Sequence, residues 1–191
     1  MNDIEIEIKV QVEHDTVLKE FLEERAQSVG TSEQRDEYFT PAHRDFTTVR
    51  PVGEWLRIRS EGEKHSLNYK NFHHTPEGKT LYCDEYELDI ASADALRKVL
   101  LALQFRSLVT VMKRRETWKY KQYEIVLDQV EGLPPAVEVE YKGDAPAADA
   151  LKIKEEMMQF LKDRRCGKLK INEQGYPFLL MFPNEATFEE I

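Results

Sequence analysis

The stretch Ile4-Glu5-Ile6-Glu7-Ile8-Lys9-Val10 alternates strictly between apolar and charged residues. A period of two is typical of a β-strand with one buried face, so the isoleucines point to one side and Glu5, Glu7 and Lys9 to the other. The same Glu-x-Glu pattern occurs twice more, in Glu85-Tyr86-Glu87 and in Glu138-Val139-Glu140. The chain therefore contains three strand-like segments that each carry two carboxylates on one face.

Each of these segments is followed by a helical pattern of apolar residues. The first helix is predicted to start with Asp15 or Thr16 as its N-cap and to stop at Gly30. The second is predicted over Ser92 to Leu101, and the third from about Ala147 to Arg164. We therefore expect about three helices, none of which reaches the 18 apolar residues of a membrane span.

Further alternating segments lie between these units. They predict two antiparallel pairs and one weaker strand: Trp55 to Arg59 with Ser66 to Lys70, Val109 to Lys119 with Gln122 to Val130, and Asp36 to Phe39 alone. The total is about eight strands, and the short turns between them favour an antiparallel sheet. The expected fold class is α+β.

The charged faces of these strands differ in sign from strand to strand. Arg57, Arg59, Lys70, Lys113 and Arg115 lie on basic strands, whereas the Glu-x-Glu pairs lie on others. A solvent-exposed face explains any one strand, but carboxylates are poor strand formers and would repel each other on an open sheet. An eight-stranded antiparallel β-barrel with about three covering helices resolves this, because its charged faces would line a tunnel.

Such a tunnel would have two walls of opposite charge. Carboxylates suit Mg²⁺ or Mn²⁺, which take oxygen ligands, and guanidinium and ammonium groups suit phosphate oxygens. A polyanion with several phosphates, together with a divalent metal, would neutralise both walls. An apolar ligand is a poor match, because barrels that carry one line their interior with apolar residues.

The composition of the whole chain limits its partners. The 191 residues contain 36 acidic and 27 basic residues, which gives a net charge of −9. This balance argues against binding to DNA or to an anionic membrane surface. Two cysteines, Cys83 and Cys166, and an acidic N-terminus without a signal-peptide pattern predict a cytoplasmic protein. We expect one domain over residues 1–191, with a core of about 2–182 and an acidic tail at 184–191.

Seven elements in this order resemble the CYTH domain, the family of triphosphate tunnel metalloenzymes. They are Glu5-Ile6-Glu7-Ile8-Lys9, Leu56-Arg57-Ile58-Arg59, Tyr69-Lys70, Glu85-Tyr86-Glu87, Lys113-Arg114-Arg115, Leu127-Asp128-Gln129-Val130 and Glu138-Val139-Glu140. The overall spacing looks closest to class IV adenylyl cyclase-like members. The resemblance implies a triphosphate substrate bound in the tunnel with Mg²⁺ or Mn²⁺.

The resemblance also implies roles for individual residues. The triphosphate would be held by Arg57, Arg59, Lys70, Lys113 and Arg115, with Tyr176 as a contact near the tunnel mouth. The metal would be bound by Glu5, Glu7, Glu138 and Glu140, with Asp128 nearby. Lys9 would orient a water or a substrate oxygen, and Glu85 and Glu87 would order the basic residues or share in metal binding.

Two departures from the family pattern concern the substrate contacts. Asn68 stands where many members carry a second lysine, and Gly175 replaces the serine of the cyclase-type motif before Tyr176. Two reactions therefore stay open: cyclisation of ATP to cyclic AMP and pyrophosphate, or hydrolysis of inorganic triphosphate, thiamine triphosphate or a nucleoside triphosphate. A non-catalytic polyphosphate-binding or nucleotide-binding module is a third alternative. The oligomeric state is also open, with a homodimer as one alternative.

Overall fold

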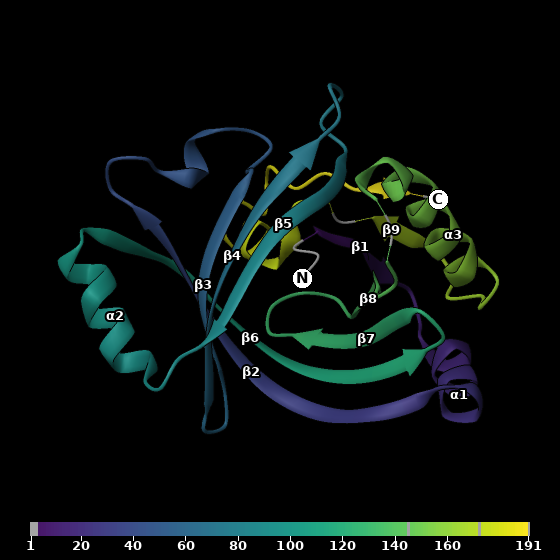
Figure 1. The fold of residues 1–191 in the computed structure, drawn as a ribbon. Coiled ribbons are helices and arrows are strands. Elements are labelled where there is room, and N and C mark those ends of the chain that lie inside the picture. Colours follow the sequence, from purple (N-terminus) through teal and green to yellow (C-terminus); the bar gives the residue numbers. More distant parts are fainter. Residues whose placement is uncertain (1–3, 145, 172, 191) are drawn as a thin grey trace.

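The computed structural model describes residues 4–144, 146–171 and 173–190, so positions 2, 3, 145 and 172 of the expected core and position 191 of the expected tail lie outside it. Eight antiparallel strands form a closed barrel in the order β1-β5-β4-β3-β2-β6-β7-β8, and β8 pairs back onto β1 (Figure 1). The strands are β1 (Ile4–Val12), β2 (Gln27–Pro41), β3 (Glu54–Glu61), β4 (Lys64–His74), β5 (Thr80–Asp89), β6 (Phe105–Tyr120), β7 (Tyr123–Val130) and β8 (Ala136–Tyr141). The predicted barrel is confirmed.

The barrel wall is uneven around β1. Residues 6–11 of β1 pair with β8, whereas only Ile4 and Glu5 pair with β5. At the other end of β1, Val10 to Val12 pair with the short strand β9 (Leu169–Ile171), which in turn pairs with β10 (Glu189–Glu190). The middle of β1 therefore has a ladder partner on one side only.

Apolar side chains cover the outside of the barrel, as the alternation predicts. Helices α1 (Thr16–Arg25) and α3 (Ala150–Lys162) belong to a core with the outward residues of β1, β7 and β8. Helix α2 (Ala93–Ala102) packs on another side, where Leu100 joins Leu56 and Ile58 (Figure 1). The hydrophobic faces of strands and helices thus pack against each other outside the barrel. The charged faces of the strands point into its interior.

Two predicted boundaries were wrong in the same region. Helix α1 ends at Arg25, and Gly30 lies inside β2, where the register shifts between Ser28 and Gly30. Gly30 has a φ of 137°, which a residue with a Cβ rarely adopts. The first half of β2 is polar and largely exposed, so its sequence lacks the alternation that marks a strand. For that reason the sequence predicts only Asp36 to Phe39 as a strand in this region.

The structure also adds a fourth helix, α4 (Gly175–Met181), to the three that were expected. Seven residues are too few to establish a helical period in the sequence. Pro177 is tolerated because it stands in the first turn of the helix. Tyr176, Phe178 and Leu179 of α4 are buried, so this helix is fixed by packing against the barrel and not by its own propensity.

The remaining general features agree with the composition. Both cysteines are free and buried. Among residues 4–144, 146–171 and 173–190, the structure contains no helix that combines the length and the apolar character of a membrane span.

Candidate active site

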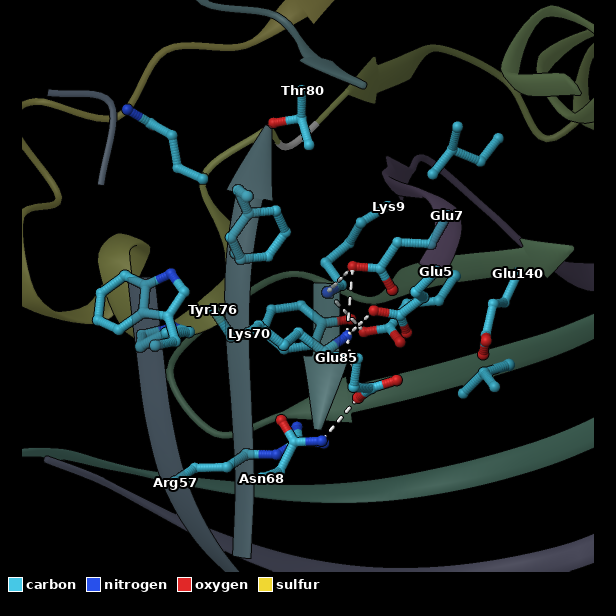
Figure 2. Close-up of a pocket in the computed structure, with 18 of the residues that line it drawn as sticks. Glu5, Glu7, Lys9, Arg57, Asn68, Lys70, Thr80, Glu85, Glu140 and Tyr176 are labelled. Atoms are coloured by element: carbon cyan, nitrogen blue, oxygen red, sulfur yellow. Dashed lines mark hydrogen bonds and ion pairs between the residues drawn. The ribbon is translucent and has the colours of Figure 1, made fainter. Parts of the chain in front are cut away.

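The charged faces of the strands line one cavity inside the barrel, and the labelled side chains in Figure 2 point into it from several strands. Every site residue predicted from the sequence lines this cavity except Asp128. The basic wall consists of Arg57, Arg59, Lys113 and Arg115 on β3 and β6, and the acidic wall consists of Glu5, Glu7, Glu85, Glu138 and Glu140 on β1, β5 and β8.

Asp36 of β2 organises the basic wall. Its carboxylate accepts hydrogen bonds from Arg59 Nε at 2.7 Å and from Arg59 Nη2 at 2.8 Å, which is a bidentate pair. Arg57 Nη1 and Lys113 Nζ each lie 3.4 Å from the same carboxylate. Burial raises the pKa of Asp36, but the three basic residues outweigh it and hold this pKa far below its usual range. One ionised carboxylate thus positions three cations.

Arg57 has a side-chain hydrogen-bond donor that no described residue uses. Its Nε is buried and has no hydrogen-bond partner among the described residues. A buried donor without a partner costs about 1–3 kcal/mol, so such groups are rare unless a ligand satisfies them. The guanidinium of Arg57 also lines the cavity, where it is available to an anion.

Lys113 is the most confined cation of the basic wall. Its side chain is 3% exposed, and its one ion pair among the described residues is with Asp36. Burial lowers the pKa of Lys113 to about 7, and the positive charge of Arg115 adds to this effect. A bound polyphosphate would supply the negative charge that this ammonium lacks.

Replacing Lys113 with methionine is expected to stabilise the protein in a pH-dependent way. The folded-state pKa is about 7 against an ordinary 10.5, so between these values the unfolded chain binds more protons and the wild type gains stability as the pH rises. Lys113→Met should therefore raise the free energy of unfolding at pH 6–7, and this gain should shrink toward pH 10. Urea unfolding across this range tests it, with exposed Lys119→Met as control; a gain that is constant with pH would contradict it.

Arg115 connects the basic wall to the acidic wall. Its Nε and Nη2 donate to Asp128 at 2.8 and 2.6 Å, and Nη2 also donates to Glu138 at 2.7 Å. Tyr176 of α4 donates its hydroxyl to Asp128 at 2.9 Å. Both oxygens of Asp128 are thus bound by protein donors beneath the cavity surface. Its predicted role as a metal ligand stays a prediction, and the contacts give it a second role in holding Arg115 and α4.

The predicted catalytic residues occupy different depths of the cavity. Lys9 Nζ lies 3.0 Å from Glu138 and 3.7 Å from Glu7. Burial alone would lower the pKa of Lys9, but Glu138 and Glu7 outweigh it, so the pKa is raised and the ammonium is charged. Glu87 is exposed at the rim and accepts a hydrogen bond from Ser66 at 2.8 Å. Lys9 is therefore the deeper group and is better placed beside a bound substrate.

Lys70 lies on the acidic wall, although the sequence grouped it with the basic residues. Its ammonium donates to Glu5 and lies 3.5 Å from Glu85 (Figure 2). Asn68, at the position of the missing second lysine, donates to Glu85 at 2.6 Å. Strand register explains this placement, because β4 lies between β3 and β5 and Lys70 stands directly opposite Glu85.

Two carboxylates of the acidic wall, Glu140 and Glu5, have raised pKa values, whereas basic neighbours outweigh burial and lower the pKa values of Glu7, Glu85 and Glu138. Burial and the nearby Glu5 raise the pKa of Glu140 to about 8, although Lys142 pairs with it. Burial also raises the pKa of Glu5, and Glu7 and Glu85 add to this while Lys70 opposes it. Carboxylates with raised pKa values close to one another indicate a place that would favour an added cation.

The acidic wall therefore fits a divalent metal by its chemistry. Glu5, Glu7 and Glu140 offer the carboxylate oxygens that Mg²⁺ or Mn²⁺ prefers. In the described part of the chain, however, no group of three or more His, Cys, Asp or Glu side chains is already arranged as a metal site. Side chains of this wall would have to move to coordinate an ion.

Several cavity residues were missed by sequence reasoning. Tyr38 of β2 lines the cavity, and Asp36 of the same strand lies beneath the basic wall that it holds; their shared parity could have revealed them if the full length of this strand had been recognised. Lys142, Lys154 and Glu173 line the cavity from segments after the end of β8, where no strand pattern indicates a direction. Tyr38 and Trp55 add an aromatic part to the cavity lining.

Comparison with known proteins gives consistent matches over most of the chain. The CYTH domain model matches residues 3–169. A protein of Methanocaldococcus jannaschii that carries the provisional name of adenylate cyclase is 32% identical over 174 residues, which is 91% of this chain and 96% of that protein.

Solved structures show the same fold. A protein of Pyrococcus horikoshii OT3 is 25% identical with a TM-score of 0.76, covering 95% of this chain and 99% of that one. A protein of Hippeastrum, provisionally named an adenylyl cyclase and described with a dominant triphosphatase activity, is 20% identical with a TM-score of 0.63 over 96% and 97% of the two chains.

Proposed function

Because this chain belongs to the CYTH domain family, we propose that it is a divalent-metal-dependent enzyme that binds a triphosphate inside the barrel and breaks one of its phosphoanhydride bonds. The observation that carries the proposal is the pair of walls of opposite charge across one cavity. Four cations face the oxygens of a polyphosphate on one side, and carboxylates suited to Mg²⁺ or Mn²⁺ face it on the other.

The residues would have different roles, which follow from their positions in the cavity. Arg57, Arg59 and Lys113, held in place by Asp36, would bind the phosphate oxygens and neutralise the charge that develops as the bond breaks. A metal bound by Glu5, Glu7 and Glu140 would polarise a phosphoryl oxygen. Lys9 would orient the attacking oxygen.

The first reaction that we propose is cyclisation of ATP, in which the ribose 3′ oxygen attacks the α-phosphorus and pyrophosphate leaves. The name of the Methanocaldococcus relative supports it. The aromatic lining at Tyr38 and Trp55 supports it as well, because a flat base could pack there.

The second candidate is a triphosphatase, in which a water attacks the terminal phosphorus, the diphosphate part of the substrate leaves, and orthophosphate is the other product. The dominant triphosphatase activity described for the Hippeastrum neighbour favours it, although that likeness is one of fold. Both reactions would use the same basic wall, because they differ in which phosphorus faces the nucleophile.

Product analysis separates the two reactions. The purified protein would be incubated with Mg²⁺ or Mn²⁺ and, in separate reactions, with ATP, tripolyphosphate or thiamine triphosphate. Cyclic AMP with pyrophosphate indicates the cyclase, and orthophosphate indicates the triphosphatase. Binding of these substrates without any product would contradict an enzyme and leave a triphosphate-binding module.

A further inference from the structure

Lys70 holds a central position on the acidic wall. Its Nζ donates to Glu5 Oε2, lies 3.5 Å from Glu85 Oε1 and lies 3.9 Å from Glu7 Oε1. In Figure 2 the ammonium is surrounded by these three carboxylates. They come from two strands, β1 and β5, and Lys70 from a third, β4. One ammonium therefore contacts carboxylates from two paired strands, β1 and β5.

These contacts satisfy the carboxylates with protein donors. Cys83 Sγ donates to the same oxygen of Glu5 at 2.9 Å, and Asn68 donates to Glu85 at 2.6 Å. The side chain of Lys70 is 14% exposed, so its pairs are shielded from solvent. Glu5 and Glu85 are thus not free oxygen ligands but already have partners that another cation would have to replace.

Glu5 and Glu7 are also carboxylates to which we assign the divalent metal. An ammonium and a metal ion bound to the same carboxylate oxygens would lie within a few ångströms of each other and would repel each other. We propose that Lys70 and the divalent cation compete for these carboxylates, and that Lys70, once displaced, turns to the bound triphosphate. Metal binding and triphosphate binding would then favour each other through this one side chain.

The geometry allows the second position of Lys70. On β3, Trp55 stands directly opposite Lys70, and Arg57 is its diagonal neighbour two residues along. Diagonal neighbours on one face lie about 7–8 Å apart, within reach of a long side chain. A displaced Lys70 can therefore approach phosphate oxygens bound at Arg57. The competition takes its metal site from the proposed function, and this second half takes the triphosphate from it as well.

The test measures Mn²⁺ binding without any phosphate, by the electron paramagnetic resonance signal of free Mn²⁺ at pH 8. Lys70→Gln is expected to bind Mn²⁺ about tenfold more tightly than the wild type, since a charge-assisted hydrogen bond no longer has to be broken. Lys70→Arg keeps the competing charge and should stay close to the wild type. If Lys70→Gln does not fold, as judged by circular dichroism, Lys70→Met takes its place.

Lys154→Gln is the matched control. Lys154 lines the same cavity, donates to the carbonyl oxygen of Thr80 at 2.7 Å, and has no ion pair within 4 Å among the described residues. Its removal lowers the positive charge near the acidic wall without freeing a carboxylate, so the gain in Mn²⁺ affinity should be clearly smaller.

Two results would overturn the inference: Mn²⁺ affinity in Lys70→Gln that is equal to or weaker than that of the wild type, or an equal gain in Lys154→Gln. Neither result depends on turnover, so a failure here is distinguishable from a failure of the proposed function. The second half is tested by tripolyphosphate titration in the presence and absence of Mn²⁺. The wild type should show a larger gain from Mn²⁺ than Lys70→Gln, and an equal gain in both would overturn the coupling.

Discussion

Replacement of Arg57 by alanine is expected to lower turnover of the triphosphate substrate by about a hundredfold to a thousandfold, the cost of removing one preorganised donor to developing charge. Arg57 lines the cavity, and its Nε is buried without a partner among the described residues. The fold should persist, because Asp36 keeps its bidentate pair with Arg59 and its contact with Lys113. Steady-state kinetics and thermal unfolding measure the two effects.

The control for this prediction is Arg114→Ala. Arg114 lies on β6, the other strand of the basic wall, but its side chain is 52% exposed and its one ion pair among the described residues is with Glu116, at 3.9 Å. Its removal should change turnover less than about threefold. Comparable losses in both variants would show that overall positive charge matters and that Arg57 has no special position.

The variant Glu138→Ala is expected to lose both activity and stability. Glu138 pairs with Lys9 at 3.0 Å and with Arg115 at 2.7 Å, and all three groups are largely buried. Its removal leaves Lys9 with Glu7 at 3.7 Å as its nearest carboxylate among the described residues. Breaking a buried pair from one side costs about 3–5 kcal/mol, so the free energy of unfolding should fall by this amount. Denaturant unfolding measures it, and the same protein assayed with substrate should show little turnover.

Glu124→Ala separates this effect from a general change in cavity charge. Glu124 lines the same cavity from β7 and has no ion pair within 4 Å among the described residues. Glu124→Ala is expected to lower the free energy of unfolding by less than about 1 kcal/mol, as substitutions at surface positions do. If Glu138→Ala were no less stable than Glu124→Ala, the Lys9–Glu138–Arg115 network would not hold the barrel interior together.

Most of the fold and most of the cavity lining could be predicted because strand alternation is a local property. Apolar and charged residues alternate within a few positions in three segments: Ile4 to Val10, Glu85 to Glu87 and Val137 to Tyr141. β2 and α4 could not be predicted in the same way. β2 is stabilised over its polar half by pairing with β6, and α4 by burial of Tyr176 and Phe178 against the barrel. Neither interaction leaves a periodic pattern in the sequence.

The sequence by itself determined that the interior of the barrel is charged and that Arg57, Arg59, Lys113 and Arg115 come from other strands than the Glu-x-Glu pairs. The tertiary structure alone decided which charges meet. Register places Lys70 against Glu85 and, through the β1–β5 pairing, beside Glu5, while Asp36 lies among the cations of β3 and β6. Ion pairs form over a few ångströms between residues that are far apart in the chain, so they depend on strand order and register, which alternation within a single strand does not specify.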